Sequence, residues 1–148
     1  MDEERNRGLI RRWFEEVWNQ GREETIDELV APDSIIHGLG DAGRQVRGPE
    51  GFREFCHPFR AAFSDFHVDV DDVIVEGDQV VSRITFSGKH TGEGIGVPPT
   101  NRTFTSTAIV ITRWQNGQIV ESWNEFDAAG MMGQLTPPSD PAQMKLKA

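Results

Sequence analysis

Apolar residues recur at helical spacing near the start of the chain, in two adjacent rows: Leu9, Trp13 and Val17, and Ile10, Phe14 and Trp18. Both rows have a period of four, so they form one broad apolar stripe along an amphipathic helix. Gly21 is a favourable residue for ending this helix. A second, shorter helix is predicted over residues 24–30, because the backbone before Pro32 disfavours helical geometry.

A third helix is predicted to begin at Gly48, because Pro49 suits the first turn of a helix. Its apolar face consists of four aromatic residues and one alanine: Phe52, Phe55, Phe59, Ala62 and Phe63. Pro58 falls inside this pattern and is expected to kink or split the helix.

After residue 65 the apolar period changes to two, which predicts β-strands. Strands are expected near 68–71 and over 80–90, 104–114 and 119–127, with a short one earlier at 34–37. Asn116-Gly117 is a strong signal for a hairpin turn between the last two strands. Gly-rich or Pro-rich loops are expected at 38–43 and 92–101, and residues 128–135 are expected to add a helical turn.

Helices that precede an antiparallel sheet predict an α+β fold. A strongly curved antiparallel or mixed sheet, with three N-terminal helices across its open side, would form a cone that encloses a pocket. One domain is expected over residues 1–135. The Pro-rich segment 136–148 is expected to be a disordered tail.

The charge balance argues against several classes of partner. The chain has 15 Lys and Arg residues against 24 Asp and Glu residues, which gives a formal net charge of -9 at pH 7. This charge disfavours binding to nucleic acid and to an anionic membrane surface. No apolar stretch reaches the ~20 residues that span a bilayer, and the charged N-terminus is unlike a signal peptide. A cytoplasmic protein is therefore expected.

Three residue types limit the available chemistry. The single cysteine, Cys56, excludes a disulfide framework or a thiolate cluster, and it is expected to be buried on the third helix. The absence of Tyr removes phenol acid/base chemistry. The four histidines do not recur at metal-ligand spacing, so no metal site is expected.

Four segments together resemble the SnoaL-like polyketide cyclases, also called ester cyclases: EVWNQG at 16–21, GPEG at 48–51, HTGEGIGVPPT at 90–100 and NGQIVESWNEFD at 116–127. The resemblance implies an NTF2-like cone, a homodimer or homotetramer, and chemistry without a cofactor. Family members with known roles close a ring of an aromatic polyketide by intramolecular aldol condensation. The implied partner is therefore a small apolar or aromatic carbonyl compound.

Asp127 is the first candidate for catalysis. It lies an even number of residues from Trp123 on the last strand, so the two side chains are expected on the same face of the sheet. Trp123 is expected to point inward, and Asp127 with it. A carboxylate in an apolar pocket has a raised pKa, which suits a general base that takes a proton from an activated carbon. The resemblance also implies an acid/base role at this position. The alternative is a helix N-cap, because two alanines follow.

Two histidines are further candidates. His90 shares parity with Ile84 and Phe86 and is expected to face the interior, where it could polarise a substrate carbonyl or hold Asp127. The alternative is a structural histidine satisfied by backbone groups. His37 ends the short early strand, a place that often lines the pocket in the family, although it could instead be exposed.

The last two strands supply two charged candidates for substrate binding. A two-residue turn would pair Arg113 with Val120, on the face opposite Asp127, whereas a three-residue turn with a bulge would bring Arg113 to the face of Asp127. If it points inward, Arg113 would stabilise a developing enolate; otherwise it is a surface ion-pair partner. Glu125 shares the parity of Asp127 and could be a second pocket carboxylate or a solvated rim residue. Asn124 is expected on the other face.

Four aromatic side chains are candidates for stacking on a flat substrate: Phe14, Trp18, Phe63 and Trp123. Their alternative role is core packing. The favoured function is a cofactor-free cyclase, with an epoxide hydrolase or hydroxylase-like enzyme as one alternative. A non-catalytic ligand-binding or assembly domain is the other. A buried carboxylate that converges with hydrogen-bond donors in a closed pocket would favour an enzyme, whereas a pocket filled by Phe and Trp side chains would favour the non-catalytic domain.

Overall fold

The structure, a computed structural model, describes residues 2–39 and 44–136. The elements in chain order are α1 (Glu3–Trp13), the π-helical segment η1 (Phe14–Asn19), α2 (Glu23–Leu29), β1 (Val30–His37), β2 (Gln45–Arg47), α3 (Gly48–Ala62), β3 (Phe63–Glu76), β4 (Gln79–His90), β5 (Thr103–Gln115), β6 (Gln118–Phe126) and α4 (Ala128–Leu135). The tail expected at 136–148 lies outside the described residues except for Thr136, as does most of the loop expected at 38–43.

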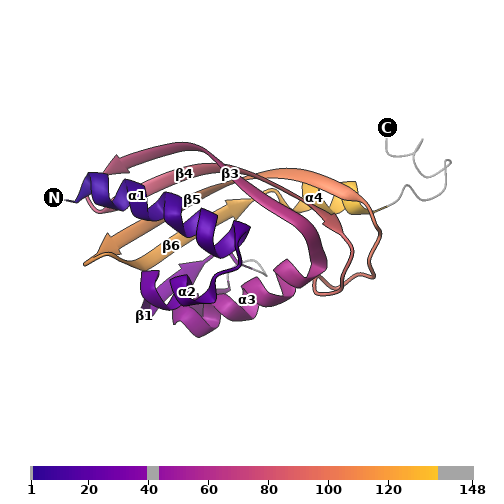
Figure 1. Ribbon diagram of the computed structural model, residues 1–148, viewed down its shortest axis with the longest axis horizontal. Helices are drawn as coiled ribbons and strands as arrows, with labels where there is room; N and C mark the ends of the chain where they lie inside the picture. Colours follow the sequence, from indigo (N-terminus) through magenta and orange to yellow (C-terminus); the bar gives the residue numbers. More distant parts are fainter. Residues whose placement is uncertain (1, 40–43, 137–148) are drawn as a thin grey trace.

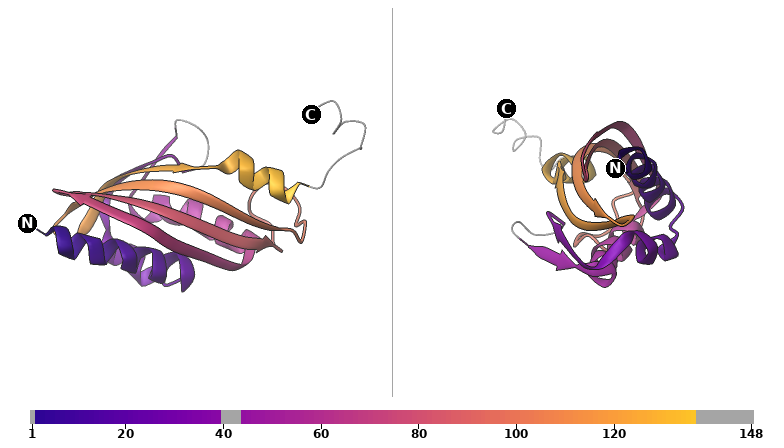
Figure 2. Two further views of the ribbon diagram at one scale, coloured as in Figure 1. Left: turned by 90° about the horizontal axis from the view of Figure 1, so that it is seen from above. Right: turned by 90° about the vertical axis from the view of Figure 1, so that its left-hand side faces the viewer.

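Six strands form one mixed sheet in the order β2-β1-β6-β5-β4-β3. Every neighbouring pair is antiparallel except β1 and β6, which run parallel. The long strands curve around one side of the molecule, while α1, α2 and α3 lie across the other side and α4 follows the end of β6 (Figure 1; Figure 2, right). This arrangement confirms the predicted α+β fold with helices across the open side of a curved sheet.

The first predicted helix is present, but it changes character after Trp13. In η1 the N–H of Gln20 donates to the C=O of Glu15, five residues earlier, at 2.9 Å. Asn19 then joins η1 to the sheet, because its side-chain amide donates to the C=O of Val68 at 3.0 Å and its Oδ1 accepts from the Val68 N–H at 2.7 Å. The apolar spacing at 9–18 fits both helix types, so it did not reveal the wider turn.

Several details of local structure differ from the predictions. Of the two effects expected of Pro58, the split does not occur, because the third helix runs unbroken through residues 48–62. Phe63 begins β3 instead of ending that helix, and β1 begins at Val30 and includes Pro32. The strand β2 was not predicted, because three residues are too few to show a period.

The β5–β6 hairpin combines a two-residue turn with a bulge. Asn116 and Gly117 both have positive φ, +53° and +77°, as a type I′ turn requires. Trp114 pairs with Ile119, but the next partners are Arg113 and Glu121, so Val120 is an extra residue in β6. A bulge of this kind reverses the alternation of side chains along the rest of the strand.

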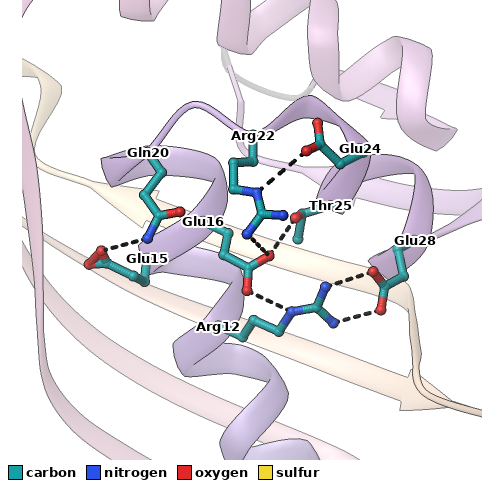
Figure 3. Close-up of polar contacts among 8 residues, drawn as sticks. All are labelled: Arg12, Glu15, Glu16, Gln20, Arg22, Glu24, Thr25 and Glu28. Carbon is teal, nitrogen blue, oxygen red and sulfur yellow. Dashed lines mark hydrogen bonds and ion pairs between the residues drawn. The ribbon is translucent and has the colours of Figure 1, made fainter.

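An ion-pair network fixes the end of the first helix to α2 (Figure 3). Glu16 is at its centre: one carboxylate oxygen accepts from Arg12 Nε at 2.7 Å, and the other accepts from the Thr25 hydroxyl at 2.6 Å. Arg12 also makes two 2.6 Å hydrogen bonds to the Glu28 carboxylate. The side chain of Glu16 is only 15% exposed, so this carboxylate depends on its partners. The hydrogen bond from Arg12, followed by that from Thr25, lowers the pKa of Glu16.

Replacing Glu16 by Gln is expected to lower the melting temperature at pH 7 by roughly 5 °C, because charge-assisted hydrogen bonds to a largely buried group are lost. A carboxylate with a lowered pKa stabilises the fold above its unfolded pKa of about 4.5, and this contribution is lost as the pH falls. The melting temperatures of the two proteins should therefore begin to converge as the pH falls below about 4.5, and they should meet only below the lowered pKa that Glu16 has in the folded protein. Glu24→Gln, at a side chain that is 73% exposed, is the control and should change little.

Candidate functional site

A cavity lies between the helices and the concave face of the sheet, and its wall is predominantly aromatic. Three of its rings come from the first helical region: Trp13, Phe14 and Trp18. Six others come from α3 and the strands: Phe52, Phe55, Phe59, Phe66, Phe86 and Phe126. Trp18 stands among several of these rings, with centroid separations of 5.5 to 6.4 Å. Such a wall suits a flat apolar ligand.

Only four polar residues line this cavity within the described part of the chain, and all are uncharged: Ser34, Thr112, Ser122 and Asn124. They belong to β1, β5 and β6, so they gather on the sheet side of the cavity. Ser122 pairs with Thr112 on one side and with Ile36 on the other, two residues from Ser34. We call this group the polar floor.

Two members of the polar floor already have hydrogen-bond partners. Thr112 accepts from the indole N–H of Trp114 at 2.8 Å and donates to the C=O of Val80 at 3.4 Å. The side-chain amide of Asn124 donates to the C=O of His37 at 3.0 Å, which leaves its oxygen for another group. The hydroxyl of Ser34 is fully buried and finds no partner among the described residues.

The expected inward orientation of Trp123, Glu125 and Asp127 is wrong. The bulge at Val120 reverses the alternation, so the residues of β6 that line the cavity are Ile119, Ser122, Asn124 and Phe126. The expectation that Asn124 lies on the other face is wrong for the same reason. The cavity therefore receives an amide where a carboxylate was expected.

Trp123, His37 and Arg113 instead form a cluster with Glu121 on the outer face of the sheet. His37 stacks on Trp123 with ring centroids 5.6 Å apart, and its Nε2 lies 2.8 Å from a carboxylate oxygen of Glu121. Arg113 donates to the other oxygen at 2.7 Å. The hydrogen bond from His37, followed by that from Arg113, lowers the pKa of Glu121. Neither expected strand partner of Arg113 is correct, because the turn has two residues and the bulge aligns Arg113 with Glu121. The alternative role of Arg113, an ion-pair partner on the outer face, is the observed one.

Asp127 caps α4. Its Oδ1 accepts from the Gly130 N–H at 2.9 Å, and its side chain is exposed. The N-cap alternative is therefore the observed one, and the structure does not place this carboxylate in the cavity wall.

Replacing Asp127 by Ala is expected to destabilise the protein by about 1 kcal/mol, because the cap is lost. Asp127→Asn should be nearly neutral, since Asn caps helices equally well. Turnover should be unchanged in both folded variants, measured beside Glu125→Gln as a neighbouring exposed control. A hundredfold loss in a folded Asp127→Asn protein would instead restore the acid/base role.

His90 is fully buried, as expected, but it is not part of the cavity wall. Its Nδ1 accepts from the Thr100 N–H at 3.3 Å, and it packs against Phe63 with centroids 5.6 Å apart. Its Nε2 has no partner within the described residues. His90 therefore ties the end of β4 to the following loop and does not contact Asp127.

The remaining candidates divide between the cavity and the core. Phe14 and Trp18 lie in the cavity wall, whereas Phe63 packs against Phe59 and Phe104 outside it. Cys56 is buried as predicted, and burial raises the pKa of its thiol to about 12, which makes it a poor nucleophile. Residues 2–39 and 44–136 contain no group of three His, Cys, Asp or Glu side chains placed to hold a metal ion.

Sequence reasoning missed Ser34, Ser122 and Asn124. The sequence signal for Ser34 was weak. It is a small polar residue two positions before Ile36, and this spacing places both side chains on the same, inward face of a strand. Ser122 and Asn124 could be found only by placing the bulge correctly. Of the helices described by the structure, none combines the length and apolar character that crossing a bilayer requires.

Comparison with known proteins gives consistent matches over most of the chain. The family model for SnoaL-like polyketide cyclases matches residues 8–135. Nogalonic acid methyl ester cyclase of Streptomyces nogalater is 29% identical over 124 residues, covering 82% of this chain and 91% of the relative. Aklanonic acid methyl ester cyclase of Streptomyces peucetius is 28% identical over 131 residues, covering 88% and 90%. The crystal structure of a candidate polyketide cyclase from Streptomyces antibioticus has 37% identity and a TM-score of 0.75, covering 86% of this chain and 96% of its own.

Proposed function

The chain belongs to the SnoaL-like polyketide cyclase family, and on that premise we propose that it closes a ring of a neutral aromatic polyketide ester by intramolecular aldol condensation. The observation that carries this proposal is the aromatic cavity with its uncharged polar floor. Aromatic rings would stack on the wall side chains, and carbonyl groups would face Ser34, Ser122 and Asn124.

The charge of the cavity wall favours an ester over a free acid. Its described residues include no cation that could pair with a carboxylate. An unpaired charge in an apolar site is costly, and the chain already carries a net charge of -9. The relatives named above are methyl ester cyclases, which agrees with a neutral substrate.

The proposed ring closure needs no electron transfer. A carbon between two carbonyls loses a proton and bonds to a ketone carbon, and the ketone oxygen gains a proton, so substrate and product are isomers. When the nucleophilic carbon reacts as its enol, the enol O–H supplies the proton that the new alcohol requires. The contribution of the cavity would be to hold the chain folded with the two carbons in contact, which can replace a large part of an entropic barrier.

The test uses a synthetic tricyclic aromatic methyl ester, with the ester group on the ring system, that bears a 1,3-diketone side chain as the carbon nucleophile and, on a neighbouring side chain, a separate ketone as the electrophile. It is compared with the corresponding free acid. We expect the ester to be converted to a product of equal mass and different retention time, with a rate unaffected by a chelator. The acid should bind and react at least tenfold less well, because its charge has no partner in the cavity. Equal conversion of ester and acid would contradict the proposal.

A ligand-binding protein without catalysis is the second candidate. It is favoured by the same cavity wall, which holds no titratable side chain among the described residues. Tight binding of the ester with no acceleration of ring closure would support this alternative and exclude the cyclase.

We also propose that two copies of the chain associate through the outer face of β5 and β6. Ile109 is 49% exposed there, beside the partly exposed Ile111 and Trp123. An exposed apolar sheet face of this kind is a natural contact between identical subunits. Trp123, which pairs with Ile111, enlarges this apolar face.

Replacing Ile109 by Lys is expected to convert a dimer or tetramer to a smaller species, because two like charges would meet across a symmetric contact. Light scattering at micromolar concentration measures the mass. Ile74→Lys is the matched control: Ile74 is 64% exposed on β3, away from the proposed contact, and should leave the mass unchanged. A strict monomer for the unaltered protein would contradict the proposal.

A further inference from the structure

The hydroxyl of Ser34 has no hydrogen-bond partner, although its residue is fully buried and lines the cavity. Leaving a buried hydroxyl unpaired is unfavourable, and an intramolecular partner is the usual solution. Ser82 on β4 has the same two properties, full burial and no partner among the described residues, but it does not line the cavity. Of these two serines, it is therefore Ser34 whose hydroxyl can find its partner in a ligand in this cavity.

Ser122 and Ser34 lie on the neighbouring strands β6 and β1, and both line the cavity. Ser122 is opposite Ile36 in the register, and Ile36 and Ser34 are alternate residues on the inward face of β1. Ser122 is also buried and lines the cavity. The hydroxyl of Thr112, on the other side of Ser122, is already hydrogen-bonded to Trp114 and Val80. Two serines on neighbouring strands, Ser34 and Ser122, therefore line the cavity where a ligand would lie.

We propose that Ser34 and Ser122 together bind a ketone oxygen of the ligand, and that this site orients the ring system in the cavity. This inference rests on the proposed function, because it identifies which substrate group the polar floor receives. Both hydroxyls donate to the carbonyl oxygen, which has two lone pairs and can accept both. A neutral carbonyl matches two neutral donors, whereas a carboxylate would bring a charge into an apolar site.

The same contact would serve the proposed reaction. During ring closure the attacked ketone oxygen gains negative charge before it is protonated. The hydrogen bonds from the two hydroxyls, which strands β1 and β6 hold in place, would strengthen as that charge develops. This stabilises the transition state and lowers the barrier to ring closure. Ser34 and Ser122 are therefore assigned to binding and orienting the electrophilic ketone, and the proton balance stays that of the enol mechanism.

A pair of probes that differ only at the carbonyl tests the site without requiring turnover. Fluorenone and fluorene have the same three-ring shape, but only fluorenone has a ketone oxygen. Quenching of tryptophan fluorescence gives both dissociation constants, since Trp13 and Trp18 line the cavity. We expect the unaltered protein to bind fluorenone about tenfold more tightly than fluorene, the value of one or two neutral hydrogen bonds.

The double variant Ser34→Ala, Ser122→Ala should bring the ratio of the two affinities close to one, mainly because it binds fluorenone more weakly. Each single variant should give an intermediate ratio. Ser82→Ala is the matched control, because it removes a similarly buried, unpaired hydroxyl outside the cavity, and its ratio should stay near tenfold. Circular dichroism and melting temperatures establish that all variants are folded.

Two outcomes would overturn the assignment while leaving the proposed function in place. One is a tenfold preference for fluorenone that persists in the double variant, which places the carbonyl elsewhere. The other is equal binding of fluorenone and fluorene by the unaltered protein. Failure of the unaltered protein to bind either probe would remove the aromatic binding site itself, and with it the proposed function.

Discussion

Replacing Ala108 by Phe is expected to abolish binding and turnover of an aromatic ester while leaving the protein folded. Ala108 lies in the cavity wall between two other lining residues, paired with Ile84 on one side and Phe126 on the other. A phenyl ring at this position would occupy the space that the substrate rings require. The melting temperature should stay the same or rise, because the new ring fills a void and gains contacts there.

The expected loss in turnover is at least about a hundredfold, since excluding one substrate ring forfeits roughly 1.5–3 kcal/mol of apolar contact and also prevents the reactive alignment. The measurement is the rate of ester conversion, together with quenching by fluorenone. Thr107→Phe is the matched control, because Thr107 is exposed on the opposite face of the same strand. Normal turnover in a folded Ala108→Phe protein would show that the reaction occurs outside this cavity.

The parts of the fold that depend on local periodicity could be predicted from sequence. The apolar stripe at residues 9–18 and the alternation over 80–90 each come from a single repeated spacing, and the Asn116-Gly117 turn requires only two residues with positive φ. The resemblance of four segments added the cone and its family. The parallel pairing of β1 with β6 joins residues as far apart in sequence as Val30 and Ile119, and no local pattern indicates it.

The candidate site could not be predicted as well, because its residues depend on one bulge. Val120 is an ordinary strand residue, and nothing in its type indicates that it is left unpaired. A shift of one residue exchanges every later side chain between the two faces. This single feature moved Trp123 and Glu125 outward and Ser122 and Asn124 inward, whereas Phe14 and Trp18 lie upstream and were unaffected.

The second large effect is expected for Asn124→Asp, which introduces a carboxyl group into the polar floor. Two causes should raise the pKa of this group above the usual value of about 3.9. The cavity wall around it is largely apolar, which disfavours the charged form. The His37 carbonyl that now accepts from the amide at 3.0 Å can accept from a protonated carboxyl but repels an ionised one.

The consequence is a stability that depends on pH with a defined sign. Because the folded-state pKa is raised, the folded protein binds more protons than the unfolded chain, and stability falls as the pH rises from about 4 through the folded pKa. Each unit of increase in the pKa corresponds to about 1.4 kcal/mol, and one to two units are expected for a partly buried site. Urea titrations at several pH values measure this loss against the unaltered protein.

Gln115→Glu is the matched control, since it adds an acid of the same charge at an exposed position of β5. Its stability should follow that of the unaltered protein at every pH. If Asn124→Asp behaved in the same way, the new carboxylate would be fully hydrated, and the polar floor would open to solvent instead of to an apolar cavity. A second result is possible: stability falls as expected, and the rate of ring closure in Asn124→Asp rises with pH at the same apparent pKa. In that case the ionised carboxylate at position 124 removes a proton from the substrate, which the amide of Asn124 cannot do. Because the unaltered protein lacks this base, it would then bind its substrate as the enol.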